Sequence, residues 1–191
     1  MRIGSAVALA AAMMLSGCGQ PDYVDDSRAS VLLLVGAVNE GAVLDSDVRL
    51  GLDSNLICPD TVMVSLTVRS KNPTVVGEST GDVQLTEYKV SYSRTDGRSM
   101  EGVDVPHTIQ GAVSSLILVD GDVEVPIEVV RRQAKLEPPL SNITGYDIAT
   151  MIAEITIRGT TVAGDAVSGT GALQIDFANY GDDNESCPEQ G

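Results

Sequence analysis

The side chains most able to do chemistry are few in this sequence: three cysteines (Cys18, Cys58 and Cys187) and a single histidine, His107. A structural zinc site needs four ligands, and two isolated cysteines without a C-x-x-C spacing make such a site a poor explanation. A Ser-His-Asp hydrolase would need His107 as its base, but His107 follows Pro106 in a loop-like segment. We therefore expect His107 to be an ordinary loop residue without a nucleophile elbow. We assign no cofactor and no metal-ligating residues, and calcium bound by loop carboxylates stays an open alternative.

The first 17 residues have the layout of a secretory signal peptide, in which Arg2 precedes an unbroken apolar run from Ala6 to Leu15. A transmembrane helix needs ~20 apolar residues, so this run is too short to span a bilayer. The tetrad that ends it, Leu15-Ser16-Gly17-Cys18, resembles the lipobox of bacterial lipoproteins. The resemblance implies cleavage before Cys18, lipidation of Cys18 and a location in the bacterial cell envelope. Gly19 rather than Asp behind the cysteine is similar to signals released to the outer membrane.

With Cys18 assigned to lipid, Cys58 and Cys187 remain as an even pair in an oxidising compartment. Such a pair predicts one disulfide. Residues 18–30 begin with the lipidated cysteine and continue as a polar stretch, which indicates a flexible tether. Its twelve residues after Cys18 reach at most about 40 Å when extended. Residues 179–191 are expected to form an acidic tail.

The charge balance is strongly acidic, with 12 Lys+Arg against 27 Asp+Glu and a net charge of −15. Removing residues 1–17 removes Arg2 alone, which leaves 11 basic residues against 27 acidic ones, or about −16. Such a surface repels nucleic acid. Two classes of function remain open: a noncatalytic binding or assembly module, which we favour, and an envelope enzyme that uses carboxylates or a bound cation.

Period-2 alternation of apolar and polar residues predicts strands through most of residues 31–178. The apolar run 31–38 predicts a strand buried on both faces, and 43–50 an optional short edge strand. Asp120-Gly121 predicts a hairpin between 111–118 and 122–131, with Pro126 placing the second arm at an edge or bulge. Gly169 and Gly171 predict a bend or bulge. The other expected strands are 61–70, 86–94, 148–158 and 167–178. Residues 146–154, where the third of these begins, are also compatible with a helical turn.

Seven strands, or eight with 43–50, separated by Gly, Pro and Asp turns and without an amphipathic helix, predict a single all-β sandwich over residues 31–178. The stretch 87–97 with 102–106 resembles a pattern in uncharacterised bacterial lipoproteins. The expected connectivity is similar to immunoglobulin-like and fibronectin-type-III-like domains. The chain departs from the immunoglobulin pattern in having no tryptophan and no cysteine pair on facing central strands.

Alternating strand direction predicts which connections share an end. Connections 71–85, 119–121 and 159–165 should lie at the tethered, membrane-facing end, and connections 39–60, 95–110 and 132–147 at the opposite end with the disulfide. Long loops on a rigid sandwich are where binding usually occurs, so we expect a protein partner there. The acidic residues of that end predict a cationic or cation-bridged partner: Asp45, Asp47, Asp53, Asp60, Asp96, Glu101, Asp104 and Glu137.

Overall fold

The computed structural model describes residues 28–49, 56–72, 79–180 and 187, and it confirms the all-β class with two sheets. The alternation in the sequence explains the strands. In β3 (Asp60–Ser70), Val62 and Val64 are buried, whereas Met63 between them points outward and is 40% exposed. The predicted signal peptide 1–17, Cys18 and most of the predicted tether and tail lie outside the described residues.

The remaining elements have the following bounds. The strands are β1 (Val31–Val38), β2 (Leu44–Asp47), β4 (Val83–Arg94), β5 (Ile109–Ala112), β6 (Leu116–Ile117), β7 (Asp122–Val130), β8 (Ala149–Thr161) and β9 (Ala166–Ala178). The helical segments are η1 (Asn39–Gly41), η2 (Ser79–Gly81), α1 (Arg132–Leu136) and η3 (Leu140–Asn142). The short helix α1 was not expected from the sequence, and residues from Ala149 onward form a strand rather than the alternative helical turn.

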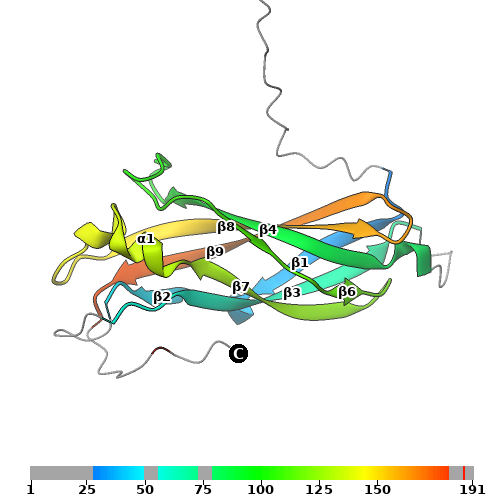
Figure 1. Cartoon of the computed structure of the whole chain (residues 1–191), viewed down its shortest axis with the longest axis horizontal. Coiled ribbons are helices and arrows are strands. Elements are labelled where there is room, and N and C mark those ends of the chain that lie inside the picture. The colour runs from blue at the N-terminus through cyan, green and yellow to red at the C-terminus, as the bar shows by residue number, and fades with distance from the viewer. Residues whose placement is uncertain (1–27, 50–55, 73–78, 181–186, 188–191) are drawn as a thin grey trace, which may run out of the picture.

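The two sheets face each other across one apolar core (Figure 1). The smaller sheet has the order β1-β3-β7, and the larger has the order β2-β9-β8-β4-β5, with β6 also paired to β4. Pairing is antiparallel except between β2 and β9. Tyr92 of β4 joins the sheets, because its hydroxyl donates a 2.6 Å hydrogen bond to the Val129 carbonyl at the irregular end of β7.

The predicted hairpin around Asp120-Gly121 is wrong. Residues 109–117 divide into β5 and β6, which both pair with β4 of the large sheet, whereas β7 pairs with β3 of the small one. The turn itself forms, since the Gly121 N–H donates to the Leu118 carbonyl, but it carries the chain between the sheets. An Asp-Gly signal specifies a reversal of the chain, and the apolar faces of the flanking strands then decide which sheet each one joins.

The expectation that β1 is buried on both faces is also wrong. β1 is an edge strand, with Val31 and Leu33 buried but Leu32 and Leu34 38% and 44% exposed. Its run of aliphatic residues therefore lies with one face on the core and the other toward solvent. The edge position predicted from Pro126 for the 122–131 strand is confirmed, because β7 forms the opposite edge of this sheet.

Gly169 and Gly171 have a role other than the predicted bulge. The register between β8 and β9 runs without a shift from Ala149↔Phe177 to Thr160↔Ala166, so β9 has no bulge against β8. A Cβ at Gly169 would lie 2.8 Å from the Leu33 carbonyl oxygen, and one at Gly171 would lie 2.6 Å from Cγ1 of Val35. The glycines thus let β1 pack closely across β9 and close that side of the sandwich.

The two ends of the sandwich collect different connections, as the sequence predicts (Figure 1). The tether end comprises residues 28–30, 71–72, 79–82, 118–121 and 162–165. The far end comprises residues 48–49, 56–59, 95–108, 131–148, 179–180 and 187. An additional strand of alternating direction would reverse every later strand and so exchange the two ends. The additional strand β2 does not do this, because it runs parallel to β9, from the tether end toward the far end, as β1 does.

Candidate functional site

The far end has a hollow of about 150 Å³ between the segment that leads into β5 and the segment that contains α1. Its apolar lining comes from Pro106, Ile109, Ala134 and Pro138. Its polar lining comes from His107, Thr108, Arg131, Gln133 and Glu137. Both segments belong to connections in which the sequence predicts a partner site, at 95–110 and 132–147.

The polar groups around the hollow are held by neighbouring groups. The Arg131 guanidinium donates a 2.7 Å hydrogen bond to the Gln110 carbonyl, and its Nε lies 3.4 Å from a Glu128 carboxylate oxygen. The Gln133 amide donates a 2.6 Å hydrogen bond to Glu137. A hollow with an apolar lining and a few fixed polar groups suits an inserted apolar side chain, with the polar groups setting its orientation.

His107 lies in a loop at the rim of this hollow, as expected from the sequence, with Nδ1 3.3 Å from a Glu101 carboxylate oxygen. Thr108 donates to the same carboxylate through both its backbone N–H and its hydroxyl. The hydrogen bonds from Thr108, followed by those from His107, lower the pKa of Glu101. These contacts order the loop before β5.

The spacing G-x-S-x-G of hydrolase nucleophile elbows does occur once, at residues 77–81, contrary to the expectation that the chain has no such elbow. Ser79 begins the 3-10 turn η2, just before the start of β4 at Val83, whereas His107 lies just before β5, whose Ile109 pairs with Val90 much further along β4. The two residues therefore cannot form a nucleophile–base pair.

A buried ionic cluster fixes α1 to the rest of the far end. Lys135 is 2% exposed, and its Nζ donates to the Asp47 carbonyl at 2.8 Å and to the Asp60 carboxylate at 2.9 Å. Ser46, which is fully buried, donates a 2.6 Å hydrogen bond to the same carboxylate. Burial raises the pKa of Asp60, while Lys135 and Ser46 oppose that shift. The cluster joins α1, β2 and β3, and no pattern in the sequence indicated a role for Lys135.

Most of the acidic residues expected to attract a cationic partner have partners within the chain. Asp60 pairs with Lys135, and Arg98 pairs with Asp96 at 2.7 Å and with Asp104 at 3.4 Å. The Arg98 hydrogen bonds lower the pKa of Asp96 to about 2. Asp45 accepts from the Tyr180 hydroxyl, and Asp53 lies outside the described residues. The far end therefore has mixed charge rather than a set of free carboxylates.

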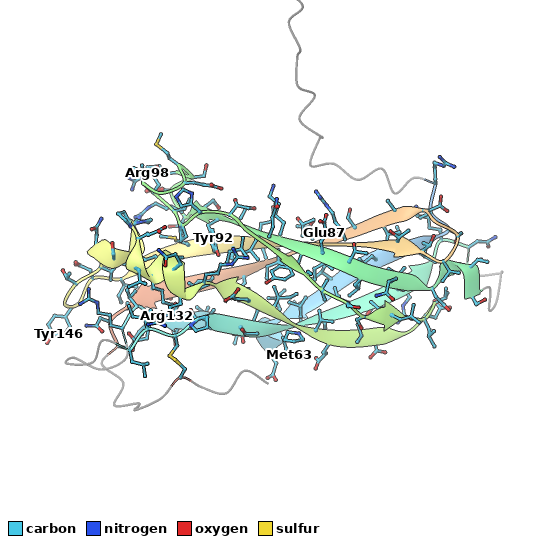
Figure 2. All side chains as sticks on the ribbon, in the orientation of Figure 1. Met63, Glu87, Tyr92, Arg98, Arg132 and Tyr146 are labelled. Carbon is cyan, nitrogen blue, oxygen red and sulfur yellow. A yellow bond between two sulfur atoms is a disulfide. The ribbon has the colours of Figure 1, made fainter. Side chains whose placement is uncertain are left out.

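Apolar side chains are exposed at the far end instead. Of the thirteen large hydrophobic side chains exposed among the described residues, six belong to this end. They are Met100, Val103, Leu136, Tyr146, Ile148 and Tyr180. Figure 2 shows Tyr146 at the extreme of this end of the sandwich and Arg132 at the start of α1.

A disulfide joins Cys58 to Cys187, with a Cα–Cα distance of 5.5 Å across 129 residues of sequence, in agreement with the predicted pairing. Cys58 precedes β3 and is 4% exposed, so the bond connects the C-terminal segment to the base of the far end.

In the described part of the chain, no group of three or more His, Cys, Asp or Glu is placed to hold a metal ion. The same residues contain no helix with the length and apolar character needed to cross a membrane.

No protein-family model matches this chain, and no curated protein matches it in sequence. Among solved structures, it is similar to a solution structure provisionally described as a late embryogenesis abundant (LEA) protein. The TM-score is 0.42 at 10% identity, over 82% of this chain and 76% of the other. A match this weak assigns neither a fold family nor a function.

Proposed function

We propose that this protein is a lipid-anchored, noncatalytic binding or assembly module of the bacterial envelope, with its anchor on Cys18 and its protein partner at the far end. The gathering of long connections, a hollow and six exposed apolar side chains at the end opposite residues 28–30 carries the proposal. Exposed apolar surface beside a pocket that combines an apolar lining with fixed polar groups is typical of protein-binding sites.

The structure changes the chemistry expected of the partner. Because Asp60, Asp96 and Asp104 have internal partners, the far end offers fewer free carboxylates than the sequence suggests. The apolar lining of the hollow instead favours a partner that inserts an aliphatic or aromatic side chain, with a polar rim around it.

We also infer an immunoglobulin-like arrangement. In such domains strands A, B and E share one sheet and strands C, F and G the other. With β2 set aside, β1, β3 and β7 occupy the places of strands A, B and E in chain order. In the other sheet, β4, β8 and β9 occupy the places of strands C, F and G. The pairing of β5 and β6 with β4 corresponds to the additional strand that extends the second sheet in variable-type domains. An experimental structure with another strand order would overturn this inference.

The anchor is tested by labelling cells with a fatty acid. The wild-type chain should incorporate label, and Cys18→Ser should not. Label that persists in Cys18→Ser would contradict the proposed anchor.

The partner site is tested by photo-cross-linking in the native membrane, with the reactive residue at Val103 or Leu136 and a matched control at Met63 on the outer face of the small sheet. The first two positions should give the same cross-linked protein, and Met63 should not. The combined variant Met100→Ser/Val103→Ser should lower the yield at Leu136 without changing the melting temperature. Cross-linking at Met63 alone would refute the proposed site.

A further inference from the structure

A second group of exposed apolar side chains lies at the tether end. Leu116, Leu118 and Val162 are 53%, 60% and 64% exposed. Leu116 of β6 pairs with Gln84, which in turn pairs with Thr160 of β8, and the Val162 N–H donates to the Asp82 carbonyl. Since Ile117, Val83 and Thr161 are buried toward the core, the alternation places Leu116 and Val162 on the outer face of the large sheet.

The three side chains therefore form one apolar corner of the sandwich around Asp82. The Asp82 carboxylate accepts a 2.9 Å hydrogen bond from the Val119 N–H, which occupies one of its oxygens. The neighbours Gln84 and Thr160 are exposed and uncharged. This end carries both signs of charge, since Asp120 pairs with Arg69 and Arg28 and Lys71 are basic, but the net charge of −15 of the whole chain makes an anionic partner unfavourable.

We propose that this corner rests on the surface of the bilayer to which the chain is anchored. The described chain begins at Arg28, at the same end as the corner, and Cys18 lies twelve residues before Ser30. Those residues hold the end within about 40 Å of the bilayer, which keeps the local concentration of lipid high. Aliphatic side chains that enter the headgroup boundary gain free energy in proportion to the apolar area they bury.

The contact orients the domain, since the far end then points away from the lipid and toward its partner. The inference rests on the proposed lipid anchor. Because the net charge of the chain disfavours anionic headgroups, the corner should contact a bilayer of zwitterionic lipid.

The absence of tryptophan from the sequence gives a direct test. The full chain, recovered in lipidated form, is reconstituted into phosphatidylcholine vesicles with one introduced tryptophan. In vesicles, the tryptophan emission of Leu118→Trp and Val162→Trp should lie at shorter wavelength than the emission of the same variants after delipidation, dissolved without detergent. Brominated lipid should quench the emission of both variants. Leu136→Trp at the far end is the matched control and should show neither change. Adding anionic lipid should weaken the quenching at position 118.

Each outcome separates the corner from the anchor. Lipid on Cys18 with an unquenched Leu118→Trp and Val162→Trp would refute the bilayer contact and leave the anchor intact. Equal quenching of Leu136→Trp would also refute it, because the domain would then have no preferred orientation. Failure of Cys18 to acquire lipid would refute the anchor. The corner could then still be tested with Leu118→Trp, in a chain whose Cys18 has been coupled to a maleimide lipid.

Discussion

The two ends of the sandwich are held together by different kinds of contact. At the tether end, the connections join through backbone N–H groups: the Lys71 N–H donates to the Ser30 carbonyl, the Ala163 N–H to the Thr80 carbonyl, and the Val119 N–H to the Asp82 carboxylate. At the far end, long connections join through side chains, in the Lys135–Asp60 ion pair and the Cys58–Cys187 disulfide. The tether end is thus held by backbone N–H donors, and the far end by side chains that reach from one segment to another.

Among the changes that test this difference between the ends, removal of the disulfide should cause the largest loss of stability. Cys58→Ser should lower the free energy of unfolding by up to about 5 kcal/mol in the chain-entropy model, because the bond closes a 129-residue loop. Denaturant unfolding measures the loss. Cys187→Ser and the reduced wild type should match it. A single variant much less stable than the reduced protein would indicate that the loss comes from packing rather than from the bond.

The buried ion pair should give the next largest effect. Lys135→Met leaves the Asp60 carboxylate buried without its cation, so a loss of about 3–5 kcal/mol is expected from denaturant unfolding. The double variant Lys135→Met/Asp60→Leu should lose less, since no charge remains buried.

The matched control is an exposed pair at the tether end. Arg69 and Asp120 have side chains that are 52% and 65% exposed, so Arg69→Ala should cost ~1 kcal/mol or less. If Lys135→Met cost as little as this control, the two ends would not differ in the way described.

The smallest of the three expected losses of stability is at the tether end, where an added methyl group would overpack the buried η2. Gly81 is buried in η2, and a Cβ there would lie 2.8 Å from both Val119 Cγ2 and Val31 Cγ1. Gly81→Ala should therefore cost about 1–3 kcal/mol in thermal or denaturant unfolding. Gly36→Ala in β1, whose Cβ would have only ordinary contacts at 3.4 Å or more, is the control. Equal stability of the two variants would show that the tether end accommodates the methyl group.

The same contrast explains how much the sequence could predict. The strands were predictable because alternation acts locally, and the division of connections between the ends followed from strand direction alone. The pairing of 109–117 with β4 was not predictable, because it depends on which sheet buries Ile109 and Ile117. For the same reason Gly169 suggested a bulge: nothing near it in sequence indicates that the Leu33 carbonyl packs against it.

In the candidate site, the sequence predicted the connections that contribute but not their chemistry. Asp60 counted as an exposed acid because Lys135, its partner, is 75 residues away in sequence. The cysteine pair was the exception, because setting Cys18 aside as the expected lipid site left one pairing of the three cysteines. The hollow itself depends on side chains from two connections and left no signal in either.

The close packing of β1 on β9 has a mechanical consequence. β1 is the first strand after the tether, and it pairs with β3 from Val31↔Ser70 to Val38↔Val64 while seated across Gly169 and Gly171. With the proposed anchor on Cys18 and the proposed partner site at the far end, tension between the two would pull along this strand. Hydrogen bonds of an antiparallel ladder lie across the strands, so such tension would shear them together rather than open them singly. The domain would then behave as a stiff spacer that transmits force from the membrane to its partner.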